Sequence, residues 1–183
     1  GRYWIEEFGI DGWRLDVASE VNDGFWRKFR ETVKKSNPDA LLIGEVWESA
    51  RHWLQGDMFD STMNYDFRKH CELFFAEQTV DAAEFAGRIT DMLMRYRLQM
   101  IPAQLNLLDS HDVSRFLSLC NGDTVKYQLV ILFLMTFVGM PTVFYGDELG
   151  IQGIQEIRRY GISSEKPLPC AVTFLRYAGG TFG

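Results

Sequence analysis

The feature that most constrains this chain is a repeated alternation of short apolar runs with longer segments of helical spacing. Apolar runs of strand length cover residues 10–15, 41–43, 103–108 and 142–145. Segments of helical length and spacing cover residues 22–35, 68–78, 81–99 and 124–138. Strands that alternate with helices form parallel sheets, because the helix carries the chain back to the edge where the first strand began. The alternation therefore predicts an α/β fold with a parallel sheet.

Capping signals mark the start of two of these helices. Asn22 or Asp23 is expected to cap the first helix, and Asp123 or Thr124 the last, because short polar side chains accept hydrogen bonds from the free amides of a first turn. The first helix is expected to end before Pro38, which cannot continue it.

An acidic residue follows each of the four predicted strands. These residues are Asp16, Glu45, Asp109 with Asp112, and Asp147 with Glu148. In a parallel α/β barrel the carboxyl ends of all strands open onto one face, where active sites are built. Each acid taken singly is better explained as a helix cap or a turn residue. Together they favour an active site in which the acids converge.

Two of these acids have the chemistry of a glycosidase. Arg14 and Asp16 lie two apart on a strand and so share a face, where the guanidinium lowers the pKa of Asp16 and keeps this candidate nucleophile ionised. Glu45 has no arginine beside it in its own strand, and charge repulsion from Asp16 and Asp112 would raise its pKa, as a proton donor requires. A nucleophile and an acid of this kind form the pair of a retaining glycosidase. The alternative for Arg14 and Asp16 is a structural ion pair.

Other side chains suit contacts with a polyhydroxylated substrate. His111 and Asp112 could form a metal site with Asp109, but adjacent residues of an extended chain point in different directions, which favours hydrogen bonds to substrate instead. Trp47 and Trp53 are candidates for stacking on sugar faces, with core packing as the alternative. The site is therefore predicted to bind a sugar without a metal.

Charge, length and cysteine count limit the partners. The chain has 19 basic and 25 acidic residues and a net charge of -6, which argues against nucleic acid or an anionic membrane as a partner. Its longest apolar run, residues 129–140, is too short to span a bilayer, which needs about 20 residues. Three cysteines, an odd number, favour free thiols and a cytoplasmic location.

The 183 residues suit one domain, or part of one, and residues 1–8 have the pattern of a helix that begins earlier, so we interpret the chain as a fragment.

Three short segments carry a resemblance to a known family. The segments Gly-Trp-Arg-Leu-Asp-Val-Ala at 12–18, Gly-Glu-Val-Trp at 44–47 and Leu-Leu-Asp-Ser-His-Asp at 107–112 resemble three conserved regions of the alpha-amylase family, in order and in interval. Further segments at 17–21, 56–65 and 144–148 resemble its cyclomaltodextrinase, neopullulanase and maltogenic amylase branch.

The resemblance implies a role for each matching residue. Asp16 matches the catalytic nucleophile of the family, Glu45 the general acid/base, and Asp112 the aspartate that distorts and stabilises the bound sugar ring. Arg14 matches the arginine that holds the nucleophile, and His111 the histidine that binds sugar hydroxyls. The roles of Asp16 and Glu45 are those expected from their chemistry.

The resemblance also implies the fold and the substrate. It predicts that residues 1–153 are the C-terminal half of a (β/α)₈ TIM barrel, about strands four to eight, and that this fragment alone is inactive. Residues 154–183 lack the family pattern and are interpreted as an unassigned tail, for which a reading-frame error is one explanation. The implied substrates are cyclodextrins, maltooligosaccharides or pullulan, cleaved at α-1,4 and sometimes α-1,6 bonds. No cofactor is expected; calcium and a homodimer are left open for a full-length parent.

Two alternatives stay open at this point. A transglycosylase, or an enzyme that converts sucrose or trehalose, would use the same groups and transfer the sugar to another sugar hydroxyl. A non-catalytic amylase-like scaffold would keep the fold without activity, but it would have no reason to retain all five of the matched residues.

Overall fold

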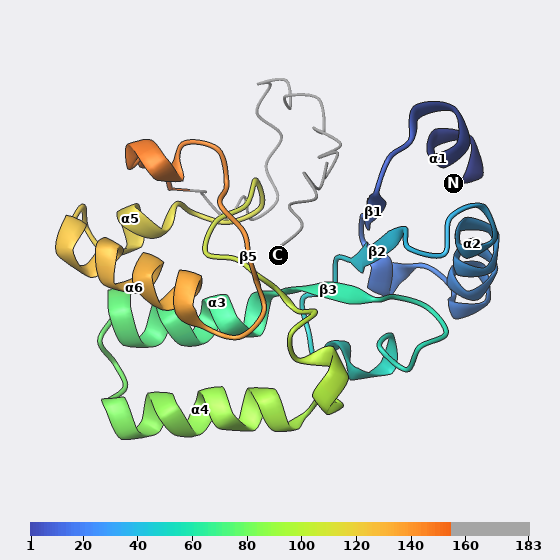
Figure 1. Cartoon of the computed structure of the whole chain (residues 1–183). Coiled ribbons are helices and arrows are strands. Elements are labelled where there is room, and N and C mark those ends of the chain that lie inside the picture. The colour runs from blue at the N-terminus through green and yellow to red at the C-terminus, as the bar shows by residue number, and fades with distance from the viewer. Residues whose placement is uncertain (155–183) are drawn as a thin grey trace, which may run out of the picture. The chain divides into compact units, whose positions relative to one another are not determined.

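The computed structural model describes residues 1–154 (Figure 1). The chain forms two compact units. The first contains Gly1–Val46 and Ala50–Thr62, and the second contains Trp47–Ser49 and the described residues from Met63 onward. The expectation for the tail at 154–183 falls almost wholly outside the described residues.

The first unit is built around two paired strands. Its elements are α1 (Arg2–Phe8), β1 (Gly12–Leu15), the 3₁₀ turn η1 (Ala18–Glu20), α2 (Asp23–Ser36), β2 (Leu41–Gly44) and the 3₁₀ turn η2 (Ala50–His52). β1 and β2 are parallel, with Gly12 opposite Leu41 and Leu15 opposite Gly44. The first two residues of β3 (Ser61–Asn64) pair in parallel with β2. This confirms the parallel sheet expected from the alternation of strands and helices.

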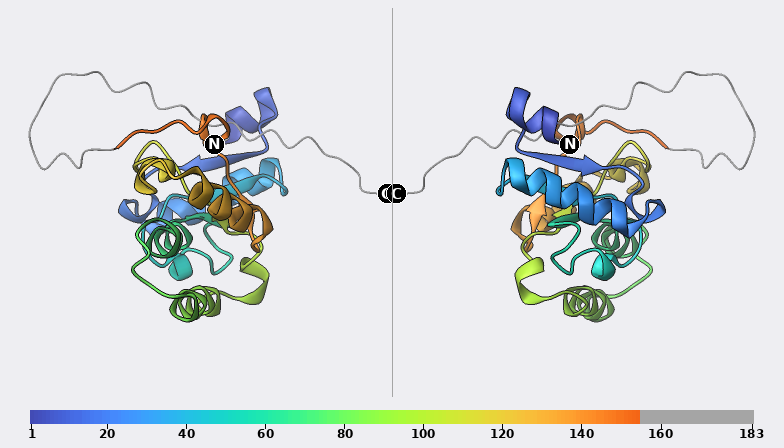
Figure 2. Two further views of the ribbon diagram at one scale, coloured as in Figure 1. Left: turned by 90° about the vertical axis from the view of Figure 1, so that its left-hand side faces the viewer. Right: turned by 90° about the vertical axis from the view of Figure 1, so that its right-hand side faces the viewer.

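Helix α2 lies alongside β1 (Figure 2). Asn22 caps it by accepting a hydrogen bond from the Gly24 amide at 2.8 Å, as its position predicts. Its buried residues are Trp26 and Val33, and Phe29 packs edge-on against Trp13 of β1 with ring centroids 5.9 Å apart. The apolar face of α2 thus covers the strand that leads to Asp16.

The second unit contains the remaining strands and helices. Its elements are α3 (Tyr65–Cys71), the π-helix η3 (Glu72–Ala76), α4 (Ala82–Met94), η4 (Leu98–Met100), β4 (Leu105–Asn106), α5 (Phe116–Leu119), α6 (Thr124–Thr136), β5 (Met140–Pro141) and η5 (Asp147–Leu149). β4 pairs in parallel with the last two residues of β3 and with β5. Within the described chain, each strand from β1 to β4 therefore pairs with the next strand in the sequence.

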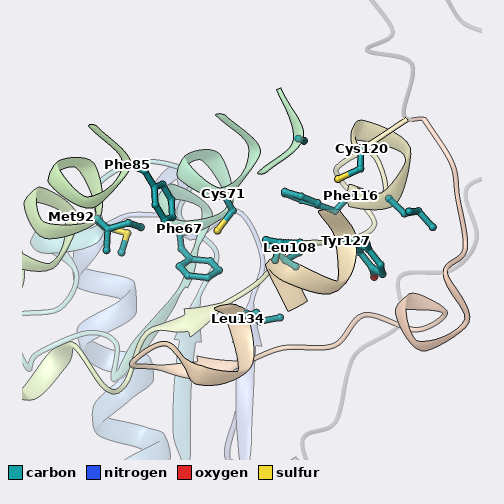
Figure 3. Close-up of a cluster of buried hydrophobic side chains, with 13 residues drawn as sticks. Phe67, Cys71, Phe85, Met92, Leu108, Phe116, Cys120, Tyr127 and Leu134 are labelled. Atoms are coloured by element: carbon teal, nitrogen blue, oxygen red, sulfur yellow. The ribbon is translucent and has the colours of Figure 1, made fainter. Parts of the chain in front are cut away.

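An apolar core joins the helices of the second unit (Figure 3). Phe67 of α3 is fully buried and stacks on Phe133 of α6, with ring centroids 5.5 Å apart. Leu108, just after β4, and Phe116 of α5 lie in the same core. This packing places the end of β4 and the segment that follows it against buried side chains.

One strand was missed in the sequence, and several of the predicted boundaries were wrong. β3 was not predicted, because its Ser61 and Thr62 are polar although they are buried. The strand expected at 142–145 lies instead at 140–141, and the Phe144 amide is bound by the Asp147 carboxylate rather than by a strand. The helix expected at 81–99 ends at Met94, and only Leu105–Asn106 of 103–108 is strand. No helix within residues 1–154 is both long and apolar enough to cross a membrane.

Candidate active site

The first unit brings the acids after β1 and β2 to the same edge of its strands. Leu15 lies opposite Gly44, so Asp16 and Glu45 are the next residues on the two strands. The pairing extends past the strands, because the Glu45 amide donates to the Leu15 carbonyl at 2.9 Å and the Ala18 amide donates to the Glu45 carbonyl at 3.0 Å. The two acids therefore leave the backbone at adjacent positions.

Arg14 forms ion pairs with both carboxylates. Its Nη1 atom contacts Asp16 Oδ1, and its Nη2 atom lies 2.7 Å from Glu45 Oε1. The contact with Asp16 is the one predicted from their spacing. The contact with Glu45 was not predicted, because sequence reasoning considered only the strand on which Glu45 lies. The parallel register places Arg14 beside Ile43 and so within reach of Glu45.

The backbone next to Asp16 is strained. Val17 has φ 45° and ψ 43°, a left-handed conformation that is rare for a β-branched residue. In this conformation its amide donates to Glu45 Oε2 at 2.9 Å. Strain of this kind persists where surrounding structure holds it and is concentrated at functional sites. No sequence signal indicated it, because valine is a residue that ordinarily avoids such a position.

Asp16 and Glu45 differ in their access to solvent. The Asp16 side chain is 62% exposed, whereas that of Glu45 is 5% exposed. Glu45 is held through both oxygens, by Arg14 and by the Val17 amide. The arrangement can present one carboxylate to a ligand from solvent while a second, fixed carboxylate lies beside it.

The second unit places His111 and Asp112 together in the segment after β4. His111 Nε2 lies 3.0 Å from Asp112 Oδ2, and the two side chains are partly exposed. The Asp112 amide donates to Ser110 Oγ at 3.2 Å. The pair thus presents an imidazole and a carboxylate at the surface, where both could bind hydroxyl groups.

The two candidate tryptophans have different surroundings. Trp47 stacks on Tyr65, with ring centroids 4.0 Å apart and planes at 10°, and it remains about half exposed. Trp53 is half-buried and packs edge-on against His52, with centroids 5.1 Å apart. Trp47 is therefore the better candidate for stacking on a sugar, and Trp53 has a packing role.

Residues 1–154 contain no group of three or more His, Cys, Asp and Glu side chains arranged to hold a metal ion. Asp109, the third ligand of the alternative metal site, accepts a hydrogen bond from the Phe116 amide at 2.7 Å and shares the Arg115 guanidinium with Asp147. Two of the acids that follow predicted strands thus meet each other in a buried cluster, which sequence reasoning did not separate from the candidate active site.

Comparisons with known proteins found a matching family model and similar sequences. Residues 1–169 match the family model described as "Alpha amylase, catalytic domain". A cyclomaltodextrinase of Thermoanaerobacter pseudethanolicus is 50% identical over 151 residues, which are 82% of this chain and 26% of that protein. Neopullulanase 2 of Thermoactinomyces vulgaris is 50% identical over 167 residues, 90% of this chain and 28% of that protein.

The chain is also similar to a solved structure. The ligand-free form of a cyclic alpha-maltosyl-(1→6)-maltose hydrolase from Arthrobacter globiformis superimposes with a TM-score of 0.82 at 40% identity. The match covers 85% of this chain and 35% of the solved chain. This chain spans about a quarter of the length of the two curated relatives.

Proposed function

Because this chain belongs to the alpha-amylase family of glycoside hydrolases, we propose that it is part of a longer retaining glycosidase, which we call the parent protein. The proposed substrates are cyclodextrins, maltooligosaccharides or pullulan, cleaved at α-1,4 and in some cases α-1,6 glucosidic bonds. The names of the two curated relatives support this substrate class. The chain would supply strands four to eight of a (β/α)₈ barrel, for which its parallel strand pairs are the support.

The observation that carries the proposal is the Arg14 guanidinium shared between Asp16 and Glu45. In the first step an Asp16 oxygen attacks the anomeric carbon, the glycosidic C–O bond breaks, and Glu45 gives its proton to the leaving oxygen. In the second step Glu45 takes a proton from water, the water oxygen bonds to the anomeric carbon, and the bond to Asp16 breaks.

Sharing one guanidinium suits the change of role that this mechanism demands of Glu45. While Asp16 is ionised, its negative charge balances Arg14, and a proton on Glu45 leaves the group of three with no net charge. Once Asp16 is esterified, its charge is lost, and Arg14 then stabilises Glu45 as the carboxylate that a base must be. The same contact therefore opposes protonation of Glu45 less in the first step, while Asp16 is charged, than in the second, when Asp16 is esterified.

The remaining predicted residues would bind substrate. Asp112 and His111 would accept and donate hydrogen bonds to sugar hydroxyls, and their partial exposure leaves their polar atoms accessible. Trp47 would stack on a sugar ring, as an aromatic ring with about half of its surface exposed can do. The reaction needs no cofactor, since Asp16 and Glu45 supply the nucleophile and the proton.

Two variants of the parent protein test the roles of the carboxylates. Asp16→Asn should lower kcat on β-cyclodextrin by at least about 10³-fold, because an amide is a poor nucleophile. Glu45→Gln should lose activity on natural substrates but keep a fast first step, seen as a burst of released aryl group, on an activated aryl glucoside, whose leaving group needs no proton. Mass spectrometry of the Glu45→Gln enzyme with a slow substrate should find the sugar on Asp16.

Other outcomes would contradict these roles. Equal losses in the rate of the first step on natural and activated substrates would remove the acid role from Glu45. Products that are mainly sugars transferred to added glucose would favour the transglycosylase. An inactive wild-type parent that binds cyclodextrin would favour the scaffold.

Cysteine usage and net charge support a proposal on the location and partners of the parent protein. An odd number of cysteines, three in all, supports a cytoplasmic location, and the two that the structure describes, Cys71 and Cys120, are free and buried. A net charge of -6 supports a neutral glucan as partner rather than nucleic acid or a membrane.

A further inference from the structure

A buried cluster of two carboxyls and one guanidinium lies in the second unit. Asp109 and Asp147 are 3% and 7% exposed, and Arg115 is 8% exposed. Arg115 Nη1 lies 3.0 Å from Asp147 Oδ1 and 4.0 Å from Asp109 Oδ2. One cation thus faces two acids, and with both acids ionised the cluster would hold an uncompensated buried negative charge.

Hydrogen bonds indicate which acid carries a proton. Asp147 accepts from Arg115 Nη1 at 3.0 Å and from the Phe144 amide, which donates to its Oδ2 at 2.8 Å. Among residues 1–154, a single amide, that of Phe116, donates to Asp109, and Asp109 lies further from Arg115 than Asp147 does. Burial, together with its hydrogen bond to Asp147, raises the pKa of Asp109 to about 7. A proton on Asp109 makes the cluster neutral and supplies the bond between the two carboxyls.

The other titratable groups around the cluster add no charge to it. The Tyr127 hydroxyl donates to the Asp147 carbonyl at 3.3 Å, and burial raises the pKa of this phenol and of the Cys120 thiol, so both stay neutral. Charged groups on the adjoining elements have other partners. Lys126 Nζ binds Gln78, Asp123 caps α6, and Glu148 binds the Gly146 amide.

Asp109 also closes the loop that carries His111 and Asp112. Its bond to the Phe116 amide spans residues 110–115 at 2.7 Å. Arg68 holds the same loop from its other side, since Nε donates to the Leu108 carbonyl at 2.7 Å and Nη2 to the Ser114 carbonyl at 3.1 Å. The position of this loop therefore depends on the geometry of Asp109.

We propose that Asp109 is a positioning residue of the glycosidase: protonated and bonded to Asp147, it closes the 110–115 loop and so holds Asp112 and His111 in place for the sugar. This inference rests on the proposed function. Loss of the Asp109 proton would put two carboxylates in contact beside one guanidinium and remove the bond between them. The loop would then loosen, and hydrolysis would fall at alkaline pH although Asp109 touches no substrate.

The pH dependence of kcat/KM in the parent protein tests this role. Wild type should lose activity above about pH 7. Asp109→Asn should move that loss upward by at least about one pH unit, because an amide donates to Asp147 at every pH and its oxygen still accepts from Phe116. Asp123→Asn is the matched control, because it makes the same change at the exposed cap of α6, where asparagine caps equally well. In this variant the alkaline loss of kcat/KM should occur at the same pH as in wild type.

Thermal unfolding gives a second readout that does not need activity. Asp109 has a raised pKa in the folded state, so wild type is penalised progressively as the pH rises from about 4 to about 7. The melting temperature of Asp109→Asn minus that of wild type should therefore increase over this range and stay constant above it.

The outcomes separate this inference from the proposed function. An unchanged alkaline loss in Asp109→Asn, in an active enzyme, would overturn the positioning role. A melting-temperature difference that is flat with pH would overturn the proton on Asp109. A wild-type parent that hydrolyses none of the glucans would instead overturn the proposed function, whatever the unfolding data show.

Discussion

Arg14 is the residue on which the arrangement of the two candidate catalytic acids depends. Its planar guanidinium reaches Asp16 with one nitrogen and Glu45 with the other. Lysine keeps the charge but is a single point donor that cannot hold two carboxylates at fixed positions. We expect Arg14→Lys to lower kcat of the parent protein about 10²-fold with little change in KM, because the loss falls on charge stabilisation in the transition state.

Arg27→Lys is the control for this substitution. Arg27 also faces two acids, since it lies 2.7 Å from Asp57 and 3.6 Å from Asp23, but its side chain is about half exposed and on the surface of α2. Its replacement should leave kcat unchanged. Equal effects of the two variants would show that Arg14 acts only through general stability.

At the scale of elements, Asp60 ties helix α2 to strand β2. Its carboxylate accepts hydrogen bonds from Arg30 at 2.7 Å and from the Leu42 amide at 3.0 Å. It also forms an ion pair with Lys34 Nζ at 2.9 Å. Burial alone would raise the pKa of Asp60, but the bonds from Lys34 and Arg30 outweigh burial and hold the pKa below its usual value. Asp60→Asn should therefore lower the free energy of unfolding of the parent protein by about 2 kcal/mol at neutral pH.

The pH dependence of this effect has a defined sign. A lowered pKa in the folded state gives stability that is present above the unfolded pKa and is lost as the pH falls through the folded one. The loss in free energy of unfolding caused by Asp60→Asn, measured by denaturant unfolding, should thus become smaller below about pH 4. Asp39→Asn, at an exposed position in the α2–β2 connection, should show no deficit at any pH. A deficit that persists at low pH would mean that Asp60 acts by packing.

At the scale of the whole molecule, the chain has a net charge of -6, so the salt dependence of binding should distinguish a neutral substrate from a charged one. A neutral glucan displaces no counterions, whereas a polyanion or polycation would bind with a strong salt dependence. We expect KM of the parent protein for β-cyclodextrin to change less than about twofold between about 0.05 and 0.5 M salt. A change of tenfold or more in steady-state kinetics would show that a charged ligand, or long-range charge, controls binding.

Features that depend on a few neighbouring residues were predictable. The Asn22 and Asp123 caps are confirmed, because a cap is a hydrogen bond to an amide two or three residues away. The contact of Arg14 with Asp16 is likewise a consequence of strand geometry over two residues. The alternation of apolar runs and helical segments also predicted the parallel pairing of strands.

Features that depend on residues far apart in the sequence could not be predicted. Ser61 and Thr62 form a strand because the edge of β2 supplies hydrogen bonds to their backbone, although their side chains have no apolar pattern. The contact of Arg14 with Glu45 requires the register between two strands, and the cluster of Asp109 with Asp147 requires the burial of both.

By itself, the sequence determined the α/β class, the helix caps and the identity of the candidate catalytic acids, because backbone geometry and side-chain chemistry act over short separations. Only the tertiary structure decided that Arg14 serves two carboxylates and that Asp109 closes a loop instead of facing a ligand. The physical reason is that charge balance and hydrogen bonding in a buried place depend on every group that packs there, and those groups come from segments far apart in the chain.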